Sequence, residues 1–533
     1  MKTIENSTHS ITSTTEDRLA FFENELAQKE QKIEELEAKV KFYEEQFRLS
    51  QAQKYGSSSE KTDPDQMSIF NEAEKFSVKL DEEPEAEEVL TKRRTGKSKS
   101  KKKYEDLPIE EVHYTLSDEE RQCPKCDHTL HEMKTEVRKE LKIIPAQVKV
   151  VHHIKQVYAC RGCDAIDSDN GGTIITAPMP KPVLPGSMVS PSVLAFIMEN
   201  KYNQALPLYR QEASFVNYGI DLSRQNMASW IIQGAEKWLS PLYDRMHTHL
   251  KQSPVIHADE SPLKVLDEKD KSQSYMWLYA TAETSEYPIY LYEYQPSRAK
   301  KHPKQFLEGF TGFLQTDGYA GYNGVENVVQ VGCLAHARRK YTDAIKALPE
   351  GSDVSLTKAN EGLSLLRKIY RLEKSFKEME PEVRYEARIE QTQPVLDAYK
   401  TWLEVEEKRT LPKSKLGQAI SYSLKQWDKL AAFMKDGRIA IDNNLAERGI
   451  KPFVLGRKNY LFAKSPKGAT ASALCYSIIE TAKANKLIPF QYLTYLFEQL
   501  PNLDIEDPEA LDAMLPWAES LPNEVRHKTE KND

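Results

Sequence analysis

Apolar residues recur at every seventh position near the start of the chain. One seam of this repeat carries Leu19, Leu26, Ile33, Val40 and Phe47, and the second carries Phe22, Lys29, Leu36 and Tyr43. This period, with Glu, Lys and Gln at the other positions, predicts a coiled coil over residues 17–50 and hence a homodimer. Lys29 interrupts the second seam, as a polar residue does where it sets the register. A lone amphipathic helix packed on the body of the protein is the alternative.

The repeat stops at residue 50, and residues 51–104 carry few aromatic side chains. An acidic block, "DEEPEAEE" at 81–88, precedes a basic block, "KRRTGKSKSKKK" at 92–103. This composition predicts a charged linker. The basic block is either solvated or bound to phosphates. The formal net charge of −7 averages over both blocks and gives no indication of nucleic-acid binding.

Two C-x-x-C pairs lie in residues 105–178, which we interpret as a small zinc-binding domain. They are Cys123 with Cys126 and Cys160 with Cys163, separated by 33 residues. Four thiolates presented by two tight turns suit a tetrahedral, structural Zn²⁺ with no open position. A redox-active pair is the alternative. His152 and His153 lie in an alternating segment and are interpreted as strand-face residues rather than ligands.

Residues 187–250 show a helical pattern interrupted by a turn at Gly219. Ser223 is then placed to cap a second helix that begins with Arg224, Gln225 and Asn226. A helix, a glycine turn and a second helix with polar residues at its start fit a helix-turn-helix that reads DNA. An ordinary helical hairpin fits the pattern equally well.

The chain changes to alternating, strand-like runs from residue 254. The order is "PVIHAD", "SYMWLYAT", "PIYLYEY", the helical "SRAKKHPKQFLEGF", the strand-like "GFLQTDGYAGYN", and "NVVQVGCLAH" entering a helix. This order predicts an α/β ribonuclease-H-like catalytic core over 251–345 and 436–490, with an all-α insertion at 346–435 and a tail at 491–533. In such a sheet the first and fourth strands are central neighbours.

Three acidic residues are expected to meet at that sheet. Asp259 ends the first strand, which breaks at Pro262, and Asp317 ends the fourth. Glu447 lies one turn inside a short late helix that Asp442 or Asn443 caps and Pro452 ends. Three carboxylates at one place repel one another unless divalent cations neutralise them. Oxygen ligands suit Mg²⁺ or Mn²⁺, and two such ions can cut a phosphodiester.

Four residues near the three acids are expected to support the site rather than to take part in catalysis. Strand alternation turns Glu260 to the face opposite Asp259, and helix capping accounts for Asp442. Cys333 and His336 form a C-x-x-H to which the sequence offers no further zinc ligands. We interpret them as a buried cysteine and a histidine near the active centre.

Basic residues crowd around the acid-bearing motifs and are expected to contact DNA phosphates. They are Arg338, Arg339, Lys340, Arg448, Lys451, Arg457 and Lys458. Backbone amides near Gly468, where a helix opens, could hold one more phosphate. Tyr319 and Tyr322 either stack on bases or pack in the core.

Several blocks of the sequence resemble the insertion-sequence-66 family of DDE transposases. They are "HADESPLKVLD", "TDGYAGYN", "GCLAHARRK", "DNNLAERGIKP" and "GRKNYLFAKSPKGATASALCYSIIETAKANKL", with "YGSSSEK" and the paired C-x-x-C motifs before them. The resemblance runs from about residue 20 to 500. It implies a transposase that binds its element's terminal repeats and cuts and joins DNA there, with Asp259, Asp317 and Glu447 as the catalytic triad. Family members often work with accessory proteins.

Two other functions are consistent with parts of the chain. One is a catalytically silent DNA-binding regulator derived from a transposase, and the other is a nuclease that cuts without joining. The intact context of all three acids argues against the first. No apolar run of membrane-spanning length and no signal-peptide core are present, so the expected location is the cytoplasm, at the nucleoid and not at a membrane.

Overall fold

The computed structural model describes residues 147–159, 174–268, 273–349 and 351–527, and short stretches between residues 24 and 44. The chain divides into two compact units, 1–56 with 151–533 and 57–150, and the fold below is that of the first unit. The expected linker and all four C-x-x-C cysteines lie outside the described residues. No helix among the described residues is long and apolar enough to cross a membrane.

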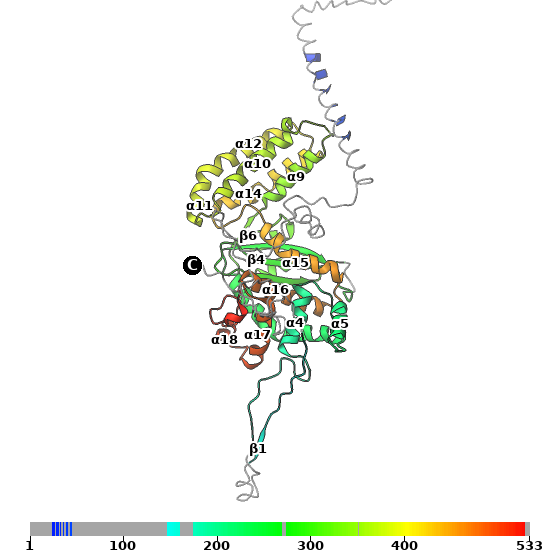
Figure 1. Cartoon of the computed structure of the whole chain (residues 1–533). Helices are drawn as coiled ribbons and strands as arrows, with labels where there is room; N and C mark the ends of the chain where they lie inside the picture. Colours follow the sequence, from blue (N-terminus) through cyan, green and yellow to red (C-terminus); the bar gives the residue numbers. More distant parts are fainter. Residues whose placement is uncertain are drawn as a thin grey trace, which may run out of the picture. The chain divides into compact units, whose positions relative to one another are not determined.

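A five-stranded sheet forms the centre of this unit (Figure 1). Its strands are β3 (Val255–Leu263), β4 (Ser274–Thr281), β5 (Tyr290–Gln295), β6 (Gly312–Gln315) and β7 (Val328–Val331), in the order β5-β4-β3-β6-β7. The first three strands pair antiparallel, whereas β3, β6 and β7 pair parallel. The strand carrying Asp259 and the strand preceding Asp317 are therefore neighbours, as expected.

Strand β3 is longer than the sequence predicts. It continues through Pro262 to Leu263 and stays paired with β4 along this length. Its pairing with β6 ends at His257. Beyond His257 one edge of β3 thus has no strand partner, and a proline is tolerated at such an edge because its missing N–H breaks no ladder bond. Asp259 lies where the parallel pairing stops, not where the strand stops.

Helices cover both faces of the sheet. Leu278 in β4 faces α15 (Asn444–Tyr460). The two elements are so close that a Cβ added to Gly449 of α15 would lie 2.7 Å from Cδ2 of Leu278. The next residue, Tyr279, stacks at 3.8 Å between ring centroids on Phe306 of α8 (Lys301–Phe306). Because successive side chains of a strand alternate, α15 and α8 lie on opposite faces.

Helix α16 (Pro466–Ala484) protects the edge strand β5. The Ser477 hydroxyl accepts the Tyr292 N–H at 2.8 Å, and the Thr481 hydroxyl accepts the Tyr290 N–H at 3.0 Å. These N–H groups would otherwise be open to pairing with another strand.

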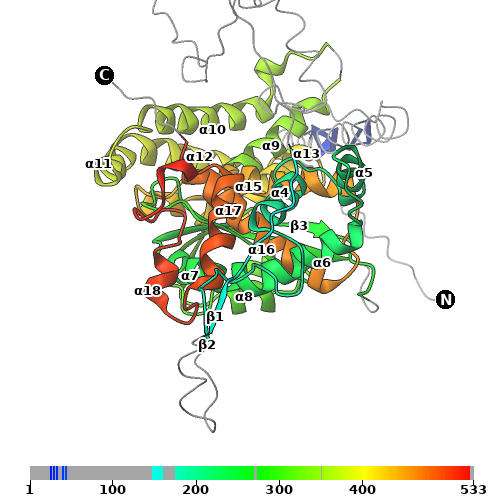
Figure 2. The ribbon, with the colours of Figure 1, turned by 60° about the horizontal axis from the view of Figure 1, so that its bottom comes forward.

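The remaining helices of the body come from both ends of the described chain. They are α4 (Pro191–Tyr202), α5 (Leu208–Asn217), α6 (Arg224–Gly234), a π-helical turn (Ala235–Leu239), α7 (Ser240–Leu250), α17 (Pro489–Gln499) and α18 (Pro508–Asp512). Helix α17 lies beside α4 and α16 (Figure 2). Its Leu493, Leu496 and Phe497 are buried. The expected tail at 491–533 therefore starts inside a packed helix.

The predicted helix, turn and helix around Gly219 is confirmed. Gly219 adopts φ +79°, a conformation that favours glycine, and links α5 to α6. The Ser223 side chain accepts the Asn226 N–H at 3.2 Å and so caps α6. Arg224 and Gln225 are exposed at the start of α6.

A second core joins β7 and α9 (Leu334–Lys346) to the insertion. The insertion contains α10 (Lys358–Ser375), α11 (Pro381–Ala387), a π-helical turn (Arg388–Thr392), α12 (Gln393–Glu407), α13 (Lys415–Lys425) and α14 (Trp427–Leu430). Arg388 is fully buried. Its guanidinium pairs with Glu373 and donates to the carbonyls of Phe433, Asp436 and Ile439, so it holds the chain that returns to the sheet.

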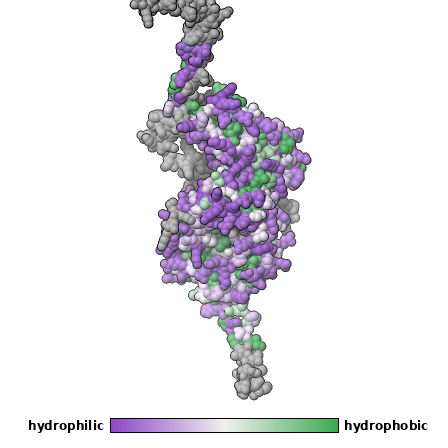
Figure 3. Space-filling view, turned by 180° about the vertical axis from the view of Figure 1, so that it is seen from behind, coloured by the Kyte–Doolittle hydropathy of each residue, from purple (hydrophilic) through white to green (hydrophobic). Residues whose placement is uncertain are grey.

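The segment before residue 160 differs from the strand that the sequence predicts there. Strands β1 (Val157–Ala159) and β2 (Ile174–Thr176) form a short antiparallel pair. His152 and His153 precede β1 in an exposed segment that is not part of a strand. Alternation of apolar residues by itself does not make a strand. The face of the molecule in Figure 3 is mainly hydrophilic, with hydrophobic side chains in scattered small patches.

Candidate active site

Asp259, within β3, and Asp317, just after β6, lie at corresponding positions of two neighbouring strands. In the parallel register, His257 of β3 lies opposite Gln315 of β6. Asp259 lies two residues after His257, and Asp317 lies two residues after Gln315. One carboxylate oxygen of Asp317 accepts the Tyr319 N–H at 2.8 Å, which fixes the turn that presents the other.

The acidity of the Asp259 carboxyl is strongly altered by its surroundings. Burial, with smaller contributions from the charges of Glu260, Asp317 and Glu447, raises the pKa of Asp259 to about 8. The Glu260 N–H donates to Asp259 Oδ1 at 2.9 Å and partly opposes this effect. Without a cation, Asp259 is therefore largely protonated at neutral pH, because ionisation would add a charge to a crowded, poorly solvated group.

Glu447 lies in the first turn of α15, where its N–H donates to the Asn443 carbonyl at 3.1 Å. The residues just before this helix are bonded to β6, which precedes Asp317, and to α9. Gln315 in β6 donates to the Ala440 carbonyl at 2.7 Å. The Leu334 N–H at the start of α9 donates to the Ile441 carbonyl at 3.0 Å. The start of α15 is thus fixed against β6 and α9.

Asn443 connects α15 to β3 instead of capping the helix with its side chain. Its Nδ2 donates to the Ala258 carbonyl at 2.9 Å, and its Oδ1 lies 3.0 Å from His257 Nδ1. Burial lowers the pKa of His257 to about 4, so the ring is neutral and its Nδ1–H donates. Asp442 provides the capping contact, accepting the Asn444 N–H at 3.2 Å. Asn443 therefore holds Glu447 at the strand that carries Asp259.

Replacing Asn443 with alanine should lower both stability and any activity of the acids. The change leaves the His257 donor and the Ala258 carbonyl unpaired in the interior, which costs about 1–3 kcal/mol. Urea unfolding measures this loss, and strand cleavage measures the displacement of Glu447.

Asn485→Ala is the matched control for this test. Asn485 donates to the Pro288 and Thr481 carbonyls, away from the acids. It should lose stability while keeping cleavage. Equal cleavage rates for the two variants at a temperature where both are folded would contradict the positioning role of Asn443.

Helix α15 does not end at Pro452, contrary to the sequence prediction. It continues to Tyr460 with Pro452 inside it. Ile450 and Phe453 on either side of the proline are buried, and the Tyr292 hydroxyl donates to the Gly449 carbonyl in the disturbed turn. Packing and this side-chain donor offset the backbone bond that proline removes.

Glu260 is occupied by partners of its own. Its side chain is 1% exposed and pairs with Arg298. Its second oxygen accepts the Tyr322 hydroxyl at 2.6 Å. Tyr322 is buried, so the base-stacking interpretation of this residue is wrong, since a ring without exposed surface cannot receive a base. Tyr319 packs under the Arg298 guanidinium at 3.7 Å from its ring centroid.

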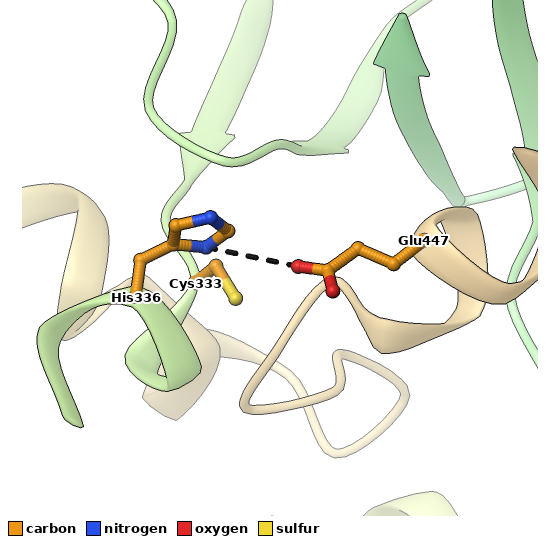
Figure 4. Close-up of side chains that lie close together, drawn as sticks. All are labelled: Cys333, His336 and Glu447. Carbon is orange, nitrogen blue, oxygen red and sulfur yellow. Dashed lines mark ion pairs between the residues drawn. The ribbon is translucent and has the colours of Figure 1, made fainter. Parts of the chain in front are cut away.

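Cys333, His336 and Glu447 come together at the facing starts of α9 and α15 (Figure 4). Their ligand atoms all lie within 4.8 Å of one another, and among the described residues they are the one such group of three. Oε1 of Glu447 lies 3.9 Å from His336 Nδ1, and Oε2 lies 3.9 Å from Arg339. Among the described residues, Asp259, Asp317 and Glu447 do not form so tight a group.

The predicted basic residues have varied surroundings. Arg339, Arg448, Lys451 and Lys458 are exposed. The Arg338 guanidinium lies 4.7 Å from the Tyr370 ring centroid, and Lys340 lies 4.8 Å from that of Tyr422. Arg457 instead donates to the Pro262 carbonyl and so holds the end of β3.

The predicted phosphate-binding glycine is also placed differently. Helix α16 begins at Pro466, before Gly468, and the Gly468 N–H already donates to the Ser465 hydroxyl at 3.3 Å. A serine at the N-cap satisfies that amide without a phosphate.

Sequence reasoning missed the connection that Asn443 makes with His257. The signal was a histidine two residues before the first acid and an asparagine four residues before the last. It could not be interpreted without the pairing of segments that lie 186 residues apart.

Comparison with known proteins identifies the relatives of this chain. The model of the transposase IS66 family matches residues 186–471, and the zinc-finger binding domain of transposase IS66 matches 120–164. The IS66 C-terminal element matches 477–517, and a model described as transposase C of IS166 homeodomain matches 43–112.

Two similar proteins come from Sinorhizobium fredii (strain NBRC 101917 / NGR234). Uncharacterized protein y4jD is 33% identical over 417 residues, which are 75% of this chain and 79% of that protein. Uncharacterized protein y4hP is 28% identical over 414 residues, which are 74% and 73% of the two chains.

Proposed function

Because the chain belongs to the transposase IS66 family, we propose that it is a DDE transposase that cuts and joins DNA at the ends of its own insertion sequence. Asp259, Asp317 and Glu447 are the acids proposed to carry the reaction. The observation that carries this proposal is the parallel register of β3 and β6, in which Asp259 and Asp317 each lie two residues beyond the paired His257 and Gln315. The sheet order supports a ribonuclease-H-like core for these acids.

The donor set fits divalent cations such as Mg²⁺ or Mn²⁺. Its members offer hard oxygen ligands, and the buried Asp259 carboxyl is destabilised when it is charged and unneutralised. Two such ions, when bound, would activate a water or a 3′-hydroxyl and stabilise the leaving oxygen. The chain itself contributes the positioning: β3 and β6 hold the aspartates, and Asn443 holds Glu447 against β3.

The other parts of the chain would bind DNA and pair protomers. All four C-x-x-C cysteines lie within the matched zinc-finger residues, which supports a structural Zn²⁺ at Cys123, Cys126, Cys160 and Cys163. Arg224, Gln225 and Asn226 are exposed at the start of α6, where a recognition helix would meet bases. The described seam residues between 24 and 44, such as Leu26 and Ile33, are exposed, which supports a coiled-coil homodimer.

The insertion offers a basic surface that contacts Asp442. Arg367, Tyr370, Arg371 and Lys374 of α10 line an open pocket. The Tyr370 hydroxyl donates to Asp442 Oδ2 at 3.2 Å, which connects this pocket to the residue before Asn443. We assign this surface, with Arg338, Arg339, Lys340, Arg448, Lys451 and Lys458, to phosphate contacts at the nucleoid.

Product analysis tests the proposed reaction. Full-length protein is incubated with labelled element-end DNA, target DNA and Mg²⁺ or Mn²⁺. We expect nicked ends that carry a 3′-hydroxyl, followed by joined products. Nicks without joining would identify a nuclease, and DNA binding without nicks, even with the accessory proteins of the same element present, would identify a silent regulator.

A further inference from the structure

The C-x-x-H motif and Glu447 form a cluster that the proposed Mg²⁺ chemistry does not use. Cys333 is the residue before α9, His336 lies in its first turn, and Glu447 reaches them from α15 (Figure 4). The three ligand atoms lie within 4.8 Å of one another. Neighbouring ligand atoms around a tetrahedral zinc lie about 3.3–3.7 Å apart, as bond lengths of about 2.0–2.3 Å dictate.

Two atoms of this cluster lack the partners that buried polar atoms normally have. His336 Nδ1 and Glu447 Oε1 are buried and without a hydrogen-bond partner. They face each other at 3.9 Å, which is too long for a hydrogen bond and close to the separation of two ligands on one ion. An ion held between two such facing atoms would give both of them a partner.

The sulfur of Cys333 lies between the starts of both helices. Cys333 directly precedes α9, and the N–H of Asn443, the residue directly before α15, donates to the sulfur at 3.2 Å. Burial raises the pKa of this thiol to about 12, so an ion must displace its proton. The sulfur therefore lies between the two segments that would close around an ion.

We propose that Cys333, His336 and Glu447 bind one transition-metal ion of the Zn²⁺ class, separate from the four-cysteine module and from the Mg²⁺ centre. A thiolate, an imidazole and a carboxylate together favour Zn²⁺ over Mg²⁺, which avoids sulfur ligands. Binding replaces the thiol proton with the metal, and that proton goes to solvent. Three protein ligands leave a fourth position for water.

The site has a consequence that rests on the proposed function. Glu447 is the one residue shared with the acid triad, and its side chain is 24% exposed. An ion held with Cys333 and His336 keeps this carboxylate turned toward α9. Zn²⁺ is therefore an inhibitor of strand cleavage that acts by withdrawing Glu447, not by filling the Mg²⁺ centre.

Metal binding is tested first, without reference to activity. Full-length protein whose four-cysteine module is already loaded with Zn²⁺ is titrated with Co²⁺. We expect wild type to bind one equivalent more than Cys333→Ser or His336→Gln, with a sulfur-to-cobalt charge-transfer band that Cys333→Ser loses. Cys475→Ser is the matched control, since Cys475 is an equally buried thiol in α16. Equal binding and equal spectra in all four proteins would overturn the proposal.

Inhibition is tested by adding Zn²⁺ to cleavage reactions at fixed Mg²⁺, with each protein compared with its own zinc-free rate. The Zn²⁺ concentration that halves the rate should rise more than about tenfold in Cys333→Ser and His336→Gln, because even residues that only support a ligand alter metal affinity about 10–100-fold. Cys475→Ser should match wild type. If Co²⁺ binds as expected but Zn²⁺ leaves cleavage unchanged, the metal site stands and the catalytic role of Glu447 fails.

Discussion

Replacement of Asp259, Asp317 or Glu447 by its neutral amide should lower strand cleavage by at least about 10³-fold without weakening DNA binding. Each change removes a charged oxygen ligand, and the stabilisation supplied by a bound cation is worth several kcal/mol. Since each 1.36 kcal/mol is about tenfold in rate, a loss near 4 kcal/mol gives this factor. Single-turnover cleavage of labelled element-end DNA, with binding measured in parallel, provides the comparison.

Asp442→Asn is the control for these variants. It is an acid near Glu447 whose contacts are with Tyr370 and the Asn444 N–H. Its cleavage rate should stay within about tenfold of wild type. If an Asp259, Asp317 or Glu447 variant cut as fast as wild type, that residue would not be a metal ligand, and Glu260 or Asp442 would replace it in the assignment.

Asp259→Asn should also stabilise the protein against unfolding when no Mg²⁺ is present. Folding raises the pKa of this carboxyl from its ordinary value of 3.8 to about 8. Between these pH values the folded state holds a proton that the unfolded state has lost, so this group's contribution to the unfolding free energy falls as pH rises. The advantage of the variant should be absent near pH 4 and reach up to roughly 5 kcal/mol at pH 8.

Chemical denaturation at pH 5 and pH 8, with and without Mg²⁺, measures this effect. Mg²⁺ should raise the midpoint of wild type at pH 8 more than at pH 5, because it competes with the proton for Asp259, and it should have little effect on the variant. Glu283→Gln, at a carboxylate that is 73% exposed, should shift stability by less than about 0.5 kcal/mol. A variant no more stable than wild type at pH 8 would show that Asp259 ionises freely in the fold.

These two predictions describe one trade-off. A carboxylate cluster that binds cations must be poorly solvated and crowded, and the same features oppose folding when the cations are absent. The amide variant therefore exchanges activity for stability at a single position.

The sequence alone determined the local elements and the residues that carry chemistry. Alternating runs predicted β3 to β7, and the glycine turn and Ser223 predicted the junction of α5 and α6. The acids could be found because each follows an apolar run or a helix start. All of these signals span fewer than about ten residues, the range over which side-chain period and capping act.

Only the tertiary structure decided how these pieces meet. The register of β3 with β6, the bonds from Asn443 to His257 and Ala258, and the approach of Glu447 to Cys333 and His336 all join segments more than 50 residues apart. Pro262 and Pro452 were misjudged for the same reason. Proline breaks a strand or helix only where its missing N–H or its ring is not accommodated, and here an unpaired strand edge and buried packing around α15 accommodate them. Hydrophobic period encodes which face of an element is buried, but not which distant side chain it will meet there.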